Sequence, residues 1–188
     1  MPPRGSDPLS TGPGEPLVSR ITSALRVVPD FPRPGIVFRD ITTVIRDPQL
    51  FGEAVEALAA ACADTAVDVV VGIEARGFVL GGALAYVLGA GFVPVRKQGR
   101  LPAAVESVAY SLEYGEAVLE MHIDAIQRGQ KVVIADDLLA TGGTASATID
   151  LVERTGASVS RLLFLIELIG LGGSAQLHAH PHTSLITL

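Results

Sequence analysis

The stretch from Lys131 to Ala147, KVVIADDLLATGGTASA, is the best guide to the fold class of this 188-residue chain. Its apolar run, Val132 to Ala135, is rich in β-branched residues and is typical of a strand buried in a parallel sheet. Residues 145–155 predict a helix, so residues 136–144 are expected to form the loop between the two elements. Ligands of open α/β sheets bind beyond the carboxyl ends of the strands. The loop is therefore the first candidate for a binding site.

This loop has the composition of a site for a phosphorylated sugar. It contains two aspartates, a glycine pair and two threonines: Asp136, Asp137, Gly142, Gly143, Thr141 and Thr144. The glycines allow backbone amides to approach a phosphate closely, the helix dipole adds to the attraction, and the threonine hydroxyls are further donors. Ionised aspartates accept hydrogen bonds from ribose hydroxyls and stabilise a cationic sugar ring. Neighbouring strand residues point to opposite faces, so both carboxylates are expected where the strand gives way to the loop.

Two nucleotide-binding motifs do not match this loop. A Walker A loop needs G-x-x-x-x-G-K-[ST], but no lysine follows these glycines, and the dinucleotide fingerprint G-x-G-x-x-G is also absent. The simplest alternative is a plain turn between strand and helix, with a capping threonine. The paired aspartates and the flanking threonines favour the binding site over that turn.

The rest of the chain predicts alternating strands and helices. Strands are expected at residues 67–73, 92–95, 132–135 and 161–166, and helices at 47–63, 78–88 and 145–155. Leu17, Ile21, Leu25 and Val28 share one face of a further helix. The alternation in residues 117–122, AVLEMH, predicts an antiparallel or edge strand. This order of elements indicates a doubly wound α/β sheet.

The composition agrees with one domain in a reducing compartment. Hydrophobic residues make up 48% of the chain and charged residues 18%, which suits a single α/β core, and the net charge of −6 gives no global attraction to nucleic acid. The single cysteine, Cys62, cannot form an internal disulfide and is expected in the core. Residues 1–16 lack the apolar core of a signal peptide, and no apolar run is long enough to span a membrane. We expect a cytoplasmic protein without a membrane partner.

The segment from Lys131 to Ala147 resembles the phosphoribosyl pyrophosphate (PRPP) motif of the type I phosphoribosyltransferases. Four more blocks follow the order of that family: FPRPGIVFRDIT (31–42), GIEARGF (72–78), VRKQGRLP (95–102) and YSLEYG (110–115). The first and last of these resemble the branch of the family that acts on adenine. The resemblance implies an α/β fold with a mainly parallel twisted sheet flanked by helices.

The resemblance also implies the domain organisation. Residues 17–188 would form a single phosphoribosyltransferase domain, and residues 1–16 are expected to be a disordered extension because they are rich in Pro, Gly and Ser. Residues 17–45 would form a small hood, and residues 99–115 a flexible catalytic loop. A homodimer is expected from the family.

The family's site residues can be carried over to matching positions. Ribose 5-phosphate would bind to Asp136, Asp137, Ala140, Thr141, Gly142, Gly143 and Thr144. Pyrophosphate would bind to Glu74, Ala75, Arg76, Arg96 and Lys97, with a cis peptide between Glu74 and Ala75. Adenine would stack on Phe38 and hydrogen-bond to backbone groups of Val37 and Arg39. The alternatives are a solvated surface cluster for Arg96, Lys97 and Arg100, and a core aromatic for Phe38.

The flexible loop would close over the bound ligands. Its expected ligand contacts are Tyr110, Glu113 and Tyr114. Glu113 would handle the proton at the purine imidazole nitrogen, although an isolated exposed glutamate is usually only a solvated charge. Closure makes physical sense because water readily captures a ribosyl cation.

The implied reaction is adenine plus PRPP giving AMP plus pyrophosphate, a step of purine salvage. Asp136 and Asp137 would stabilise the sugar cation, and Mg²⁺ would be held mainly by substrate and water oxygens rather than by a protein cage. One alternative is a phosphoribosyltransferase for hypoxanthine, guanine or orotate, against which block 31–42 argues. The other is a non-catalytic PRPP-sensing regulator, which would be expected to carry a basic surface for nucleic acid.

Three histidines near the C-terminus form a separate motif. His178, His180 and His182 would point the same way in an extended strand and could collect a transition metal. Pro181 interrupts a regular ladder there, so the sequence favours no metal function at this motif.

Overall fold

The computed structural model describes residues 15–112, 115–177 and 180–188. The chain divides into two compact units, the first ending at Ala54 and the second running from Val55 to Leu188. Apart from its last two residues, the predicted N-terminal extension lies outside the described residues. A single domain over residues 17–188, with a hood ending near residue 45, stays a prediction.

The N-terminal unit contains short helices and one antiparallel strand pair. Its elements are α1 (Leu17–Ala24), β1 (Arg26–Pro29), β2 (Val37–Asp40), α2 (Thr42–Ile45) and the first half of α3 (Pro48–Ala60). Asp47 caps α3, because its Oδ1 accepts hydrogen bonds from the amides of Gln49 and Leu50, both at 3.0 Å. The predicted helix through Val28 is wrong at its end: Val28 lies in β1 and pairs with Phe38.

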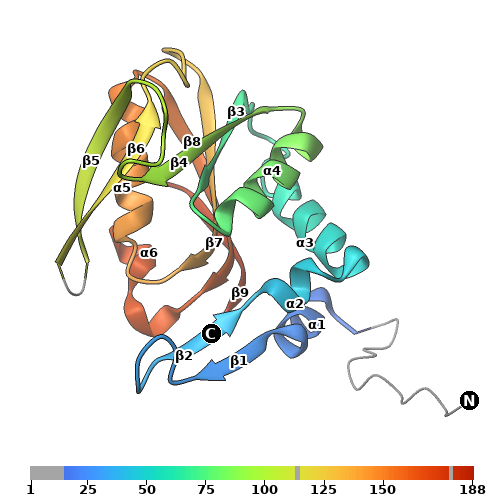
Figure 1. Ribbon diagram of the computed structural model, residues 1–188. Helices are drawn as coiled ribbons and strands as arrows, with labels where there is room; N and C mark the ends of the chain where they lie inside the picture. The colour runs from blue at the N-terminus through green and yellow to red at the C-terminus, as the bar shows by residue number, and fades with distance from the viewer. Residues whose placement is uncertain (1–14, 113–114, 178–179) are drawn as a thin grey trace, which may run out of the picture. The chain divides into compact units, whose positions relative to one another are not determined.

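The second unit is built on a seven-stranded sheet (Figure 1). Its strands are β3 (Val69–Ile73), β4 (Gly91–Lys97), β5 (Val105–Leu112), β6 (Gly115–His122), β7 (Lys131–Leu139), β8 (Ser158–Glu167) and β9 (His182–Thr187). The order is β5-β6-β4-β3-β7-β8-β9, and only the pairs β5-β6 and β4-β6 are antiparallel. The mainly parallel sheet confirms the predicted fold class.

Helices α4 (Gly77–Leu88) and α5 (Gly143–Arg154) cover opposite faces of this sheet. Gly81 of α4 lies against Gly72 and Ala135, whereas Ile149 of α5 belongs to one buried cluster with Ile134. Because successive strand residues face opposite sides, these contacts place the two helices on the two faces. The 3₁₀ turn Ile169–Leu171 and the short helix α6 (Gly173–Gln176) follow β8.

One predicted boundary in the second unit is wrong. β7 does not end at Ala135: it continues to pair with β8 as far as Leu139, so Asp136 and Asp137 lie in the strand rather than in a loop. Part of the expected flexible loop over 99–115 forms the strand β5, which pairs with β6 along its whole length. The flexibility of this segment stays a prediction. Residues 117–122 are antiparallel as predicted, but β6 is an inner strand.

The single cysteine lies in the interior of the protein. Cys62 is free and buried, as expected.

Among the helices that the structure describes, none has the length and apolar character needed to cross a membrane.

Candidate active site

A cavity of about 550 Å³ opens at the carboxyl ends of β3 and β7. Its walls come from the strand ends, the loop after β3, the β5-β6 pair and the start of α5: Ile73, Glu74, Ala75, Arg76, Lys97, Tyr110, Ala117, Leu119, Asp136, Asp137, Leu138 and Thr144. This volume lies within the usual range for small-molecule sites. The position matches the strand-end crevice expected for an open α/β sheet.

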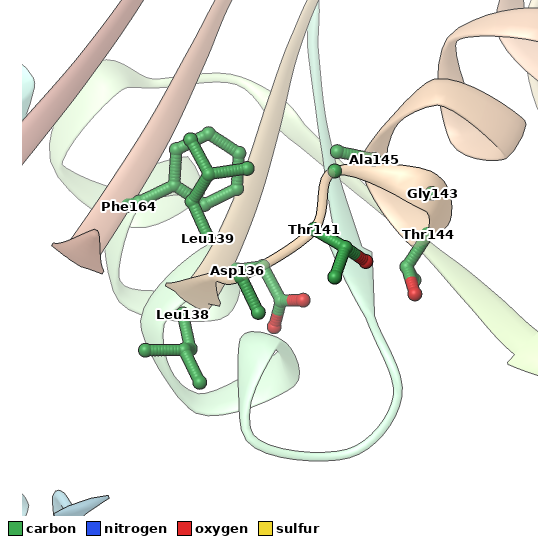
Figure 2. A pocket seen from close by; sticks show the side chains of 10 residues that line it. Asp136, Leu138, Leu139, Thr141, Gly143, Thr144, Ala145 and Phe164 are labelled. Carbon is green, nitrogen blue, oxygen red and sulfur yellow. The ribbon is translucent and has the colours of Figure 1, made fainter. Parts of the chain in front are cut away.

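A second, smaller cavity of about 70 Å³ lies in the turn between β7 and α5 (Figure 2). It is lined by Asp136, Leu138, Leu139, Ala140, Thr141, Gly142, Gly143, Thr144, Ala145 and Phe164. Gly142 has a φ of 86° and precedes α5, and no side chain within the described part of the chain caps that helix start. The first amides of a helix lack intrahelical partners and attract anions. The free amides of this turn therefore suit an anion, and phosphate binding there stays a prediction.

Asp136 and Asp137 contribute to the large cavity from adjacent positions of β7. Asp137 is only 4% exposed, and its Oδ2 accepts a hydrogen bond from Arg76 Nε at 2.5 Å. Oδ1 of Asp136 accepts a hydrogen bond from the amide of Asp137 at 2.8 Å. Burial raises the pKa of Asp136 well above its usual value, and the neighbouring charge of Asp137 raises it further. Two carboxylates held this close together favour a cationic group in the cavity.

The loop after β3 contains the cis peptide between Glu74 and Ala75 that the resemblance implied. Glu74 Oε1 accepts a hydrogen bond from Arg96 at 3.1 Å, and Oε2 accepts one from the amide of Lys97 at 3.0 Å. The hydrogen bond from Arg96 is the main cause that lowers the pKa of Glu74. The glutamate thus ties this loop to the end of β4.

The structure separates the predicted pyrophosphate residues into two groups. Glu74, Ala75, Arg76 and Lys97 line the large cavity, but Arg96 is not among its lining residues. Arg96 donates hydrogen bonds to Glu74 and to the carbonyl of Arg100, the latter at 3.0 Å, and its guanidinium carbon lies 6.0 Å from the centre of the Phe78 ring. Its observed contacts position the loop, and direct pyrophosphate binding by Arg96 stays a prediction.

The β5-β6 pair contacts α5 at both ends of that helix. Near the cavity, the hydroxyl of Thr144 donates a hydrogen bond to Tyr110 at 3.4 Å. At the far end, Arg154 pairs with Glu106 at 2.9 Å and donates to the carbonyl of Ser107 at 3.1 Å. Glu113 and Tyr114, the other predicted loop contacts, lie outside the described residues.

The predicted adenine-binding residues belong to β2 of the N-terminal unit. Val37 is half-exposed, and the rings of Phe31 and Phe38 form an edge-to-face pair with centroids 5.2 Å apart. Phe38 is not among the buried core residues of the described chain, so its alternative as a core aromatic fails. Adenine binding by Val37, Phe38 and Arg39 stays a prediction.

The C-terminal histidines do not converge among the described residues. His182 belongs to β9, and Nε2 of His180 lies 3.0 Å from Oε1 of Glu153, whereas His178 lies outside the described residues. Within the described ranges, no three His, Cys, Asp or Glu side chains gather closely enough to hold a metal ion.

Several cavity residues were not predicted from the sequence. Leu138 and Phe164 line the small cavity, and Ala117 and Leu119 line the large one. Their apolar character is common to many core positions, so no local signal distinguished them.

Comparisons with known proteins agree on the family. Residues 42–171 match the model of the phosphoribosyl transferase domain. The adenine phosphoribosyltransferase of Methylobacterium nodulans is 53% identical over 162 residues, which cover 86% of this chain and 90% of that protein.

Solved structures give the same result. The crystal structure of adenine phosphoribosyltransferase from Rhodothermus marinus matches with a TM-score of 0.89 and 51% identity, over 92% of this chain and 98% of that one. The Saccharomyces cerevisiae enzyme, complexed with D-2,5-dideoxy-2,5-imino-altritol 1,6-bisphosphate and adenine, matches with a TM-score of 0.85 and 39% identity, over 90% of this chain and 98% of that one. By sequence and by fold, the chain belongs to the phosphoribosyltransferase family, among the adenine phosphoribosyltransferases.

Proposed function

We propose that this chain transfers the 5-phosphoribosyl group from PRPP to adenine, releasing AMP and pyrophosphate. One observation carries the proposal: a carboxylate pair at the end of β7 lines a ligand-sized cavity and adjoins the glycine turn at the start of α5. The relatives named above support the choice of adenine as the base. The chain is a pentosyltransferase that acts in purine salvage.

The ribose 5-phosphate end of PRPP would occupy the two cavities. The 5-phosphate would accept hydrogen bonds from the turn over Ala140 to Thr144, where the small cavity lies. Asp136 and Asp137 would accept hydrogen bonds from the ribose hydroxyls and stabilise positive charge on the sugar as its bond to pyrophosphate breaks. These groups are positioned before substrate binds, so catalysis rests on positioning and electrostatics.

The pyrophosphate end would meet Arg76 and Lys97, which line the large cavity. Arg76 is already paired with Asp137 at 2.5 Å. When pyrophosphate enters, the guanidinium of Arg76 would donate hydrogen bonds to its oxygens. The carboxylate of Asp137 would then be able to accept hydrogen bonds from the ribose. Arginine suits this task because its planar guanidinium binds phosphate oxygens in pairs.

The base would bind to the N-terminal unit. Phe38 would stack on the purine, and backbone groups of Val37 and Arg39 would bind its edge, as the family resemblance implies. Glu113 would handle the proton of the attacking purine, with Tyr110 and Tyr114 as further loop contacts. The complex of the yeast relative with adenine supports a base site in this family.

Mg²⁺ would enter with the substrate. The carboxylates that line the large cavity belong to Glu74, Asp136 and Asp137, of which Glu74 and Asp137 already bind arginines. This donor set suits an ion that keeps most of its ligands from substrate phosphates and water, with one protein carboxylate at most. The bound ion would neutralise charge on the pyrophosphate.

A homodimer is the proposed assembly. Helix α4, with the sequence GFVLGGALAYVL, is apolar on all sides, and Val79, Tyr86 and Val87 remain exposed on it. A helix that is hydrophobic all round is normally buried. A second copy of the chain is the occupant that the family resemblance indicates.

A cytoplasmic location is proposed on the state of the cysteine. Cys62 is the single cysteine of the sequence, and it is free and buried. Free buried thiols are typical of proteins from reducing compartments.

The test is a base panel with purified protein, PRPP and Mg²⁺. We expect AMP formation with adenine, no comparable turnover with hypoxanthine, guanine or orotate, and loss of activity when a chelator removes Mg²⁺. Asp137→Asn should lower kcat/KM by about 10²-fold or more. Asp150→Asn, at an exposed aspartate of α5, is the matched control and should keep full activity. Turnover of another base without turnover of adenine would contradict the proposal.

A further inference from the structure

The turn that lines the small cavity is backed by the segment that begins α6. A Cβ atom placed on Gly173 would collide with the carbonyl oxygen of Ala140 and would lie 3.0 Å from a methyl carbon of Leu139. A Cβ placed on Gly142 would lie 2.7 Å from the carbonyl oxygen of Gly173 and 2.8 Å from Cβ of Gln176. The two backbones therefore touch without any side chain between them, and α6 lies beside the start of α5 (Figure 1).

This contact leaves the turn little freedom to move. Gly142 already has a φ of 86°, which is a left-handed conformation, and its outer side is closed by Gly173 and Gln176. Ala140 and Gly142 both line the small cavity on the other side. The direction of the amides in this turn thus depends on where the Gly173 backbone lies.

The backing segment is itself anchored to the sheet. The amide of Leu168 donates a hydrogen bond to the carbonyl of Leu139 at 2.9 Å, and the amide of Ile169 donates one to the carbonyl of Leu188 at 3.0 Å. Leu177, directly after α6, is fully buried. These contacts connect the turn to the C-terminal end of the chain.

We propose that Gly173 is a positioning residue for the 5-phosphate subsite, acting through the Ala140 carbonyl and Gly142. The inference rests on the proposed function, because it assumes that the turn binds the 5-phosphate of PRPP. Any side chain at position 173 would have to push the Ala140 carbonyl toward the small cavity or force α6 away. Either movement would turn the amides away from the phosphate. The large cavity, where pyrophosphate is proposed to bind, is not lined by Ala140 or Gly142.

The test is Gly173→Ala, with Gly170→Ala as its matched control. Gly170 is exposed, lies three residues away and has no positive φ, and no atom of the described chain lies within 4 Å of the position that an added Cβ would take. Calorimetry would measure the Kd of ribose 5-phosphate and, separately, of magnesium pyrophosphate. We expect Gly173→Ala to weaken ribose 5-phosphate binding by about tenfold or more. The Kd of magnesium pyrophosphate and the KM for adenine should stay unchanged. Gly170→Ala should match the wild type in all three measurements.

Selective loss is the outcome that supports the proposal. If the binding of both ligands weakens equally, the fold is damaged in general and the proposal is overturned. Unchanged ribose 5-phosphate binding would also overturn the proposal. If Gly173→Ala does not fold, Gln176→Ala tests the proposal in its place. This substitution shortens an exposed side chain that packs against the turn, since a Cβ placed on Gly142 would lie 3.1 Å from Cγ of Gln176. This variant should weaken ribose 5-phosphate binding about two- to fivefold and leave the Kd of magnesium pyrophosphate unchanged. Unchanged ribose 5-phosphate binding in this variant would overturn the proposal. Wild-type protein that fails to use adenine would contradict the proposed function, but these binding results would still judge the role of Gly173.

Discussion

The carboxyl group of Asp136 lies in a buried environment beside a neighbouring negative charge. Burial is the larger cause that raises its pKa, and Asp137 adds to the shift, while Arg76 opposes it. In the pH range between the ordinary aspartate pKa and this raised value, the folded protein binds more protons than the unfolded chain. The free energy of unfolding must therefore fall as the pH rises through that range. The negative charge on Asp136 that the proposed reaction needs therefore lowers the free energy of unfolding.

Asp136→Asn should separate stability from activity. At neutral pH the variant should gain about 1 kcal/mol in the free energy of unfolding, because a buried charge is removed. That gain should disappear below the ordinary aspartate pKa, where the carboxyl is protonated in both states. Urea unfolding of the unliganded protein at several pH values measures this effect, and kcat/KM should drop by about 10²-fold.

Asp150→Asn is again the control, and its stability should follow the wild type at each pH. A gain in the stability of Asp136→Asn that stays constant across acid and neutral pH would contradict the proton linkage expected for Asp136.

Helix α4 packs close to β7 because its contact face carries glycines. A Cβ on Gly77 would lie 2.7 Å from Oδ1 of Asp136 and 2.9 Å from the carbonyl oxygen of Ala135. A Cβ on Gly81 would lie 3.0 Å from the ring of Phe92. The same packing that brings the helix onto the sheet therefore also confines the Asp136 carboxylate.

Gly77 of α4 and Gly52 of α3 offer a matched pair of substitutions. Gly77→Ala should destabilise the protein by about 1–3 kcal/mol, because the new methyl group collides with Asp136 and the β7 backbone. It should also lower kcat/KM, since the collision moves a carboxylate of the proposed site. Gly52→Ala, where no atom of the described chain lies within 4 Å of the added Cβ, should instead stabilise by about 0.5–1 kcal/mol. Chemical denaturation and steady-state kinetics of both variants check the pair; equal effects would show that the close approach at Gly77 is unimportant.

The largest exposed apolar side chain of α4 bears on the assembly of the whole molecule. Tyr86 is 89% exposed, on a helix whose remaining surface is also apolar. Contiguous apolar surface of this kind usually marks an interface. The proposed homodimer would cover it.

Tyr86→Asp should therefore shift the protein from dimer to monomer in sedimentation experiments, because a charge would be buried without a partner. Ile123→Asp is the control: Ile123 is apolar and 60% exposed, but it follows β6 and lies away from α4 in the sequence. The control should sediment as the wild type does. A Tyr86→Asp protein that stays dimeric would place the interface elsewhere.

Local signals were sufficient for much of the site. The Asp-Asp pair and the Thr-Gly-Gly-Thr turn predicted a strand end with a phosphate loop, and the structure places these residues around the two cavities. The extent of β7 was misjudged because pairing with β8, not residue preference, carries the strand on to Leu139. The strand β5 within the expected flexible loop was not predicted for a similar reason, since its pairing with β6 outweighs the glycine, proline and serine residues in and around it.

The amino-acid sequence was enough to establish the family, the fold class and the residue types that meet at the end of β7, because each rests on contiguous motifs. Tertiary packing selects which basic residues reach the cavity: Arg76 and Lys97 line it, whereas Arg96 turns to Glu74 and Phe78. It also places Gly173 against Ala140, 33 positions earlier in the chain. Both results depend on contacts between residues far apart in the sequence, and such contacts exist only after the sheet and its helices have packed together.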